Sequence, residues 1–336
     1  MADGEHRAVR GAADGSSSGI SGEFVRGATA FRDWVSADGS SGYRAEPNRY
    51  HLYVSYACPW ASRAVIVRRL KGLEGAISMS VVDPLRDERG WRFGETQEKG
   101  PAPSEGLPGV GPDPIAGFQF LSEAYRATDP NFAGHVSVPV LWDTETGRAV
   151  NNESAEIIRM LGSEFDAFAE RPELDLYPAE LADEIDGINE RVYAEVNNGV
   201  YRAGFASSQE AYEDAFDRLF EALDWLEDLL SERRYLAGDR ITEADWRLFT
   251  TLVRFDPVYH NHFRCNLRKL VEYPHLYGYT RDLYQQPGIA ETVVLDQIKR
   301  HYYMTHDRLN PSRIVPKGPD QDLSGEHRRD LVGAAA

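Results

Sequence analysis

A strand, a turn, a helix and a second strand follow one another between residues 50 and 83, and Cys58 stands at the turn. The run YHLYV is a strand candidate, and PWASRAVIVRRLK reads as a helix with proline at its first position and Gly72 just beyond its end. The run AISMSVV is a second strand candidate that ends at Asp83 and Pro84. This order predicts a βαβ unit with parallel strands and a right-handed crossover.

The same pattern resumes after residue 135. VSVPVLWD reads as a strand interrupted by Pro139, followed by GRAV and by the helix candidate NNESAEIIRMLG. A proline in a strand predicts an edge or a bulge, and a cis bond is possible there. The stretch from 84 to about 135 does not fit a minimal βαβ fold, and it holds a long loop rich in proline and glycine, of a kind that is usually functional or mobile.

From about residue 175 the sequence turns helical. The segment SSQEAYEDAFDRLFEALDWLEDLL begins with Ser207 and Glu210 at the spacing of a capping box, and Thr242 with Asp245 offers a second box. One helical face of the first segment is apolar and consists of Tyr212, Phe216, Leu219, Phe220, Leu223 and Leu226. The sequence therefore predicts a small α/β domain followed by an all-helical one.

Charge and composition exclude several kinds of partner. The 336 residues carry a net charge of −17, from 54 acidic and 37 basic side chains, which argues against affinity for nucleic acid or anionic membranes. No run approaches the roughly 18 apolar residues of a membrane span, and the N-terminal residues lack the apolar core of a signal peptide, so a cytoplasmic protein is expected. The absence of CxxC, HExxH and GxGxxG patterns predicts neither a metal nor a dinucleotide.

Cys58 has two interpretations. Cysteine is among the most buried residue types, which favours inert packing. Its place between a strand and a proline-led helix favours a nucleophile, because unpaired N–H groups and the helix dipole stabilise an anion there. That setting predicts a lowered thiol pKa and thiolate near neutral pH. With only two cysteines in the chain, no disulfide framework is expected and a thiol in a reducing compartment stays available.

The strand, Cys-Pro and helix pattern, followed by a strand with an internal proline, resembles the thioredoxin fold. The residue three positions after Cys58 is Ala61, so no internal disulfide can form at this turn. Any mixed disulfide on Cys58 must then be resolved by an outside thiol, which predicts monothiol chemistry.

A thioredoxin-like domain with CPWA, followed by a helical domain, resembles the glutathione transferases, and in particular the glutathionyl-hydroquinone reductases of the Xi class. The resemblance covers roughly residues 30 to 320. It rests on YVSYACPWASR, VPVLWD, NNESAEIIRML, VNNGVYRAGFA, LFTTLVRFDPVYHNHFRCN and HYYMTHDRLNPSRIVPKGP. The expected organisation is a disordered tail at 1–22, a thioredoxin-like thiol-binding domain at 23–170 with an insertion at about 84–135, a helical quinol-side domain at 171–325, and a flexible tail at 326–336.

The resemblance implies an enzyme that reduces glutathionyl-hydroquinones. Cys58 matches the cysteine that attacks the glutathionyl sulfur, and a second thiol then clears the mixed disulfide. Release of the aryl carbon requires a nearby acid. Tyr201 and either Tyr302 or Tyr303 match tyrosines placed over the quinol, where a ring can stack and a hydroxyl can reach ring oxygens. The spacing does not decide which of Tyr302 and Tyr303 faces the site.

For the thiol co-substrate, Glu153 and Ser154 match the pair that holds the γ-glutamyl end of glutathione. A helix start suits its carboxylate and Glu153 suits its amine, although these residues could also serve only as helix caps. Val138 matches the residue whose backbone pairs with the cysteinyl part, and Trp91 matches a tryptophan at the glutathione site. The acidic surplus also fits a salt-rich cytoplasm, in which γ-glutamylcysteine could replace glutathione, since both share the γ-glutamyl end.

Two other functions stay open at this point. One is a conjugating glutathione transferase, which a cysteine at this position disfavours because it would be trapped as a mixed disulfide. The other is a non-catalytic binding module, which fold alone does not exclude. A homodimer is expected from the resemblance. A structural role is the simpler interpretation of Cys265, His301, His306 and Asp245.

Overall fold

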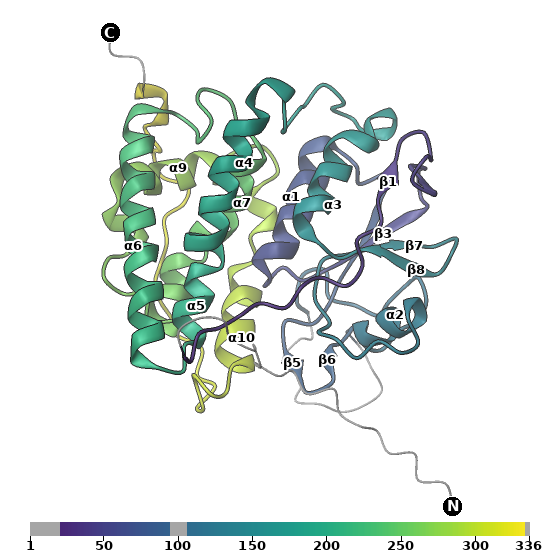
Figure 1. Cartoon of the computed structure of the whole chain (residues 1–336), viewed down its shortest axis with the longest axis horizontal. Coiled ribbons are helices and arrows are strands. Elements are labelled where there is room, and N and C mark those ends of the chain that lie inside the picture. Colours follow the sequence, from purple (N-terminus) through teal and green to yellow (C-terminus); the bar gives the residue numbers. More distant parts are fainter. Residues whose placement is uncertain (1–20, 95–105, 333–336) are drawn as a thin grey trace, which may run out of the picture.

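The computed structural model of the chain describes residues 21–94 and 106–332 (Figure 1). A four-stranded mixed sheet has the order β4-β3-β7-β8, formed by β4 (Ser78–Val81), β3 (Tyr50–Val54), β7 (Val140–Asp143) and β8 (Arg148–Asn151). Strand β3 is parallel to β4 and antiparallel to β7, so the predicted βαβ unit is confirmed. Two-stranded pairs are formed by β1 (Val35–Ser36) with β2 (Tyr43–Arg44) and by β5 (Arg86–Asp87) with β6 (Gly90–Trp91).

Helix α1 (Pro59–Lys71) begins and ends where the sequence predicts. Pro59 occupies the first turn, where a missing N–H costs nothing, and Gly72 adopts the left-handed conformation, with φ 66°, that ends the helix. The helix packs on β3 and on α3 (Ser154–Arg159), and on its other side it contacts the helical domain. In Figure 1, α1 and α3 accordingly lie between the sheet and the helical half of the molecule.

Pro139 lies outside the strand ladder. Strand β7 begins at Val140 and pairs on both sides, with β3 and with β8, so of the two predicted settings the edge is wrong; a register shift of the bulge type does occur in β7, between Leu141 and Trp142. The missing N–H of Pro139 costs no ladder hydrogen bond, because pairing with β3 begins only at Val140. The Val138–Pro139 bond is cis, which the sequence left open.

The insertion is more ordered than the sequence suggested, although residues 95–105 lie outside the described part. It contains the β5–β6 hairpin and helix α2 (Leu121–Thr128), which packs beside β8. Its second half returns to the sheet, where Val110 bridges Val81 of β4. The carbonyl of Pro108 accepts a hydrogen bond from Gln297 in the helical domain, so the insertion joins the two domains.

The second half of the chain is helical, as predicted. Its helices are α4 (Ala182–Arg191), α5 (Gly199–Phe205), α6 (Gln209–Glu232), α7 (Glu243–Leu252), α8 (His260–His262), α9 (Pro274–Tyr284) and α10 (Leu295–Thr305). Short π-helical segments, 192–197 and 255–259, connect α4 to α5 and lead into α8. The predicted apolar face of α6 packs on the core, with Leu219, Leu223 and Leu226 fully buried.

Of the two predicted capping boxes, the second is confirmed and the first is wrong, because α6 begins one residue later and Ala211, not Glu210, occupies the third helical position. Ser208, one residue after the predicted Ser207, caps α6 and accepts a hydrogen bond from the Ala211 N–H. At α7, Asp245 accepts hydrogen bonds from the Thr242 N–H, at 2.7 Å, and from the Thr242 hydroxyl. Asp245 also accepts from the Leu236 N–H and the Tyr279 hydroxyl, which explains its complete burial.

We expect Asp245→Asn to lower the free energy of unfolding by about 2–4 kcal/mol, because an amide group would face donors that the carboxylate now satisfies. Urea unfolding at neutral pH measures the loss. The exposed Asp239, just before the same helix, offers the matched change Asp239→Asn, which should stay within about 0.5 kcal/mol of the parent protein. Equal stability of the two variants would contradict the structural role of Asp245.

The ends of the chain are bound to its surface where they are described. The expected disordered tail lies outside the described residues up to residue 20. The tail expected to be flexible from 326 instead packs on the helical domain as far as residue 332, with Arg329 buried and donating to the carbonyls of Arg233 and Arg234 beyond the end of α6. Arg281 of α9 anchors the same segment at the carbonyls of Asp322 and Glu326.

Candidate active site

Cys58 is the N-cap residue of α1, in the turn that leads from β3 to the helix. Its backbone is extended, with φ −81° and ψ 121°, and its side chain accepts no capping hydrogen bond from the first turn of the helix. The half-buried sulfur lies 3.6 Å from the carbonyl oxygen of Val138, which follows from the neighbouring position of β7 in the sheet. The sequence thus placed the thiol correctly at a helix N-terminus.

The predicted pKa of that thiol is wrong in direction. Burial raises the pKa of Cys58 above its ordinary value, while the N–H groups of Ala61 and Trp60, and then Arg254 and Arg26, oppose the rise. The prediction considered the helix end and left out the loss of hydration around the sulfur. Thiolate formation therefore depends on nearby cations as well as on the helix.

Three tyrosine hydroxyls meet on the helical side of the site. Tyr201 of α5 and Tyr302 of α10 are 2.5 Å apart at their hydroxyl oxygens, and the hydroxyl of Tyr259 lies 3.0 Å from that of Tyr302. The ring of Tyr201 lies 6.3 Å from that of Trp60, two residues after Cys58. Burial raises the pKa of all three phenols, so each keeps its proton and can donate.

Tyr302 is therefore the member of the HYY pair that joins this cluster. Tyr303 turns away, and its hydroxyl donates to the carbonyl of Pro257 and accepts from the side chain of Asn261. Tyr259 was not singled out in the sequence. Its place in VYHNHF carries no local signal, because only the packing of the 255–259 segment against α10 brings its hydroxyl to Tyr302.

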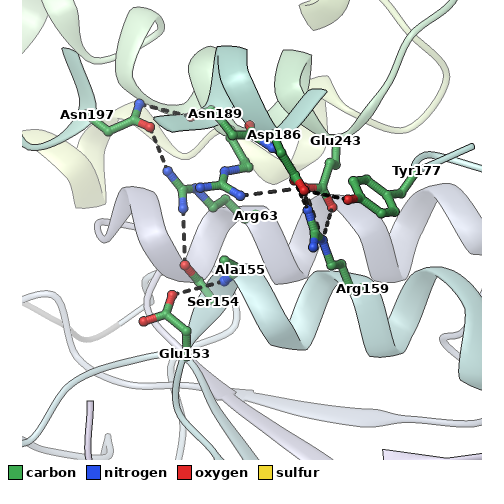
Figure 2. Close-up of polar contacts among 11 residues, drawn as sticks. Arg63, Glu153, Ser154, Ala155, Arg159, Tyr177, Asp186, Asn189, Asn197 and Glu243 are labelled. Atoms are coloured by element: carbon green, nitrogen blue, oxygen red, sulfur yellow. Dashed lines mark hydrogen bonds and ion pairs between the residues drawn. The ribbon is translucent and has the colours of Figure 1, made fainter. Parts of the chain in front are cut away.

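The predicted γ-glutamyl residues lie together at the start of α3 (Figure 2). Glu153 is the N-cap residue and accepts from the Ala155 N–H, so the capping interpretation holds. The buried hydroxyl of Ser154 accepts from the Arg63 guanidinium at 3.3 Å. Val138 lies just before β7 and forms no backbone ladder pair among the described residues, and its carbonyl oxygen faces the Cys58 sulfur.

Arg63 links this corner to the helical domain, and the sequence gave no sign of it. Its side chain is buried, lies over the Trp60 ring and donates to Asn197 at 2.8 Å. Burial lowers the Arg63 pKa to about 9. Figure 2 shows the continuation of this network through Arg159 and Glu243.

Trp91 lies on β6 at the other side of the site. It is buried and stacks on His301 of α10, with ring centroids 4.9 Å apart. The Arg86 guanidinium lies 5.6 Å from the centre of the Trp91 ring. Burial lowers the pKa of Arg86, and the Cys58 and Tyr201 side chains oppose this fall.

His301 and His306 belong to a cluster with His262. The His262 and His306 ring nitrogens are 3.2 Å apart, and His301 Nδ1 lies 2.7 Å from the carbonyl oxygen of Pro84. Burial lowers the pKa of His301 to about 3 and that of His262 to about 4. These imidazoles are neutral at physiological pH, which supports a structural role.

This cluster predicts a stability that depends on pH. A histidine whose pKa falls on folding binds fewer protons in the folded state, so the free energy of unfolding decreases as pH drops below about 6.5, by about 1.4 kcal/mol per pH unit for each such group. His301→Gln should reduce that slope by about this amount between pH 6.5 and 4.5. Urea unfolding at several pH values measures it, with His260→Gln as the control. A His301→Gln profile parallel to the parent profile would contradict the assignment.

An N-terminal segment, residues 21–34, crosses both domains in front of the site (Figure 1). Its ends are fixed by the carbonyl of Gly22, which accepts from the Ser207 N–H, and by that of Phe31, which accepts from the Asn152 N–H. Between them, the Arg26 guanidinium lies 4.8 Å from the ring centres of both Trp60 and Tyr201. Sequence reasoning missed Arg26, since the segment has no regular pattern.

The remaining candidates play no part in this arrangement. Cys265 is fully buried, and burial raises its pKa. Across residues 21–94 and 106–332, no group of histidine, cysteine and acidic side chains is arranged to hold a metal ion. In the same ranges, every helix is too short or too polar to cross a membrane.

Comparison with known proteins identifies the family of the chain. The family models of the glutathione S-transferase N-terminal and C-terminal domains match residues 57–164 and 209–282. The glutathionyl-hydroquinone reductase YqjG of Escherichia coli is 50% identical over 316 residues, which cover 92% of this chain and 93% of the relative. The glutathionyl-hydroquinone reductase PcpF of Sphingobium chlorophenolicum is 50% identical, with 90% and 92% of the two chains covered.

Solved structures give the same result. The glutathione-bound structure of YqjG superposes with a TM-score of 0.84 over 90% of this chain and 96% of that one. A Xi-class glutathione transferase from Natrialba magadii is 52% identical, with a TM-score of 0.85 and 90% of each chain covered.

Proposed function

The chain belongs to the glutathionyl-hydroquinone reductases of the glutathione transferase superfamily, and on that premise we propose that it reduces glutathionyl-hydroquinones through a mixed disulfide on Cys58. The observation that carries this proposal is the position of a single thiol at a helix N-terminus beside three buried phenol hydroxyls. The thiol supplies the nucleophile, and the phenols supply protons.

In the first half of the reaction, one bond forms and one bond breaks. The Cys58 thiolate attacks the sulfur of the conjugate, an S–S bond forms to the glutathionyl group, and the bond between sulfur and the ring carbon breaks. The ring carbon takes the electron pair and one proton, so the hydroquinone leaves reduced while the two sulfurs become a disulfide. We assign the proton donor to Tyr201, whose ring lies 6.3 Å from that of Trp60; its hydroxyl bonds the Tyr302 hydroxyl, which in turn bonds that of Tyr259.

The binding of the conjugate follows from the open groups around the thiol. We assign the γ-glutamyl end to Glu153 and Ser154, and the cysteinyl part to the backbone of Val138, whose carbonyl already lies 3.6 Å from the Cys58 sulfur. Trp91 and Arg86 form the opposite wall. The quinol ring then lies against Tyr201 and Trp60.

The second half needs an outside thiol, because Ala61 stands where a resolving cysteine would be. Its thiolate attacks the glutathionyl sulfur of the mixed disulfide, releases Cys58 and leaves as a disulfide with the glutathionyl group. Glutathione is the co-substrate of this cycle, and we propose that γ-glutamylcysteine also serves, because the assigned contacts at Glu153 and Ser154 involve only the shared γ-glutamyl end. If glutathione supported turnover and γ-glutamylcysteine did not, the proposed use of γ-glutamylcysteine would be overturned.

The test of the proposed function is product analysis with the wild-type protein. Incubation with glutathionyl-menadiol and glutathione should release menadiol and oxidised glutathione in a one-to-one ratio. Chromatography under anaerobic conditions measures both products. A conjugating transferase would instead consume glutathione and an electrophile without forming disulfide. Failure to release any menadiol from a folded protein would favour the binding-module alternative.

Two further expectations belong to this proposal. A reducing compartment such as the cytoplasm suits an enzyme that must regenerate a free Cys58. We also propose a homodimer, as the family resemblance implies, which light scattering after size-exclusion chromatography would test by a mass of twice 37.7 kDa.

A further inference from the structure

Arg254 is a buried cation without an acidic partner. It follows α7, and its side chain is only 2% exposed. Its guanidinium donates to four neutral oxygens: the carbonyls of Ala57, Tyr56 and Thr250, and the hydroxyl of Ser62, at 3.1, 2.9, 2.7 and 2.7 Å. Among the described residues, no carboxylate lies within the 4.0 Å of an ion pair. Arg329 is also buried on neutral acceptors alone, so the feature that sets Arg254 apart is where its acceptors lie.

Three of the four acceptors flank Cys58, and the fourth, the Thr250 carbonyl, lies one turn back in α7. Tyr56 and Ala57 directly precede it in the chain, and the Ser62 hydroxyl, which accepts from Arg254, donates in turn to the Cys58 carbonyl at 3.0 Å. Arg254 comes from the helical domain, 196 positions later in the sequence. One guanidinium therefore fixes the turn on both sides of the thiol and ties it to the quinol side of the site.

The charged and titratable groups that face the thiol come from several elements. Arg26 belongs to the N-terminal segment, Arg86 to β5 and Tyr201 to α5, and Arg254 approaches from the end of α7. Arg26 and Arg86 are half-buried, whereas Arg254 is only 2% exposed, so water screens its charge least. Of the cations that lower the Cys58 pKa against the effect of burial, Arg254 has the largest influence.

We propose that Arg254 is a positioning residue for the reduction: it holds the turn at residues 56–58 so that the sulfur faces the conjugate, and its buried charge favours the thiolate over the thiol. This inference rests on the proposed role of Cys58 as nucleophile. It assigns to the helical domain a direct part in activating the thiol, in addition to its part in binding the quinol.

The experiment compares Arg254→Gln and Arg254→Lys in a Cys265→Ser background, which leaves Cys58 as the one thiol. Thiolate is followed by absorbance at 240 nm and by the rate of alkylation with iodoacetamide from pH 5 to 10. Arg254→Gln should raise the titration midpoint by about one pH unit, which means about tenfold less thiolate near neutral pH. Arg254→Lys keeps the charge but loses the planar guanidinium that donates to several acceptors at once. It should therefore shift the titration midpoint by less than half a pH unit and still lower kcat about tenfold, because the turn is no longer held.

Arg329→Gln is the matched control. Arg329 is also only 2% exposed and also donates to backbone carbonyls, but these lie at the end of α6. It should lower thermal stability without moving the thiol titration. An unchanged midpoint in folded Arg254→Gln would overturn the proposal. If Arg254→Gln does not fold, the Arg254→Lys variant tests the proposal instead. A reduced kcat at a melting temperature equal to that of Arg329→Lys would support the proposal, and a wild-type kcat would overturn it.

The thiol titration needs no substrate, so its result is independent of product analysis. A wild-type protein that releases no menadiol would defeat the proposed function, whatever the titration shows. A working reductase whose thiol titrates alike with and without Arg254 would defeat only the present inference.

Discussion

Cys58→Ser is expected to lower kcat/KM for the reduction of glutathionyl-menadiol by about 10⁴-fold or more, while the protein stays folded. A serine hydroxyl has a far higher pKa than a thiol, and among the described residues the charged groups that act on residue 58 are Arg254 and Arg26, which cannot serve as a general base. Serine also cannot form the S–S bond that accepts the glutathionyl group. Steady-state kinetics, with circular dichroism to confirm folding, measures the loss.

Intact-protein mass spectrometry separates this chemical role from a role in packing. Mixed with the conjugate and no free thiol, wild-type protein should gain one glutathionyl group, and Cys58→Ser should gain none. Cys265→Ser is the matched control, since Cys265 is fully buried and its sulfur donates only to the carbonyl of Phe263. It should form the adduct at the wild-type rate and lose about 1 kcal/mol of stability. An adduct on Cys58→Ser would contradict the assignment.

The sequence predicted those parts of the fold that local patterns control. Alternation of apolar residues, Pro59 at a helix start and Gly72 after its end fix the βαβ unit, and each of these signals acts within a few residues. The helix α2 went unnoticed in a stretch dominated by proline and glycine. Its buried Leu121, Ala124 and Tyr125 do have helical spacing, which is the signal that could have found it.

The sequence was less informative about the site, because the side chains around Cys58 come from distant segments. Arg26, Arg86 and Arg254 reach it from the N-terminal segment, the insertion and the helical domain, and no local pattern marks any of them. The direction of the Cys58 pKa was mispredicted for the same reason. The helix end is visible in sequence, whereas burial of the sulfur depends on how two domains pack.

Tyr302→Phe is expected to lower kcat about 100-fold, with a smaller change in KM. The Tyr302 hydroxyl is the shared partner of Tyr201 and Tyr259, and all three side chains are buried. Without it, the Tyr201 hydroxyl loses the hydrogen bond that orients it and stabilises the phenolate left after proton transfer to the ring carbon. Loss of one positioned acid costs about 10²–10⁴-fold in rate, and an indirect partner should lie at the lower end.

The two half-reactions should respond differently. Proton transfer to the ring carbon occurs only when the hydroquinone leaves, so stopped-flow formation of the Cys58 adduct should slow by the same factor as kcat. Clearance of a preformed adduct by glutathione needs no proton on a carbon atom and should stay within about twofold of the wild-type rate. Equal slowing of both half-reactions would point instead to a general loss of site geometry.

Tyr303→Phe is the control that the neighbouring position supplies. Its hydroxyl binds Asn261 and the carbonyl of Pro257, away from the cluster, and its ring is as buried as that of Tyr302. We expect a loss of about 1 kcal/mol in stability and a wild-type kcat. If instead Tyr303→Phe slowed adduct formation and Tyr302→Phe did not, proton delivery would have to run through the 257–261 segment, and the assignment of Tyr201 as the acid would fall with it.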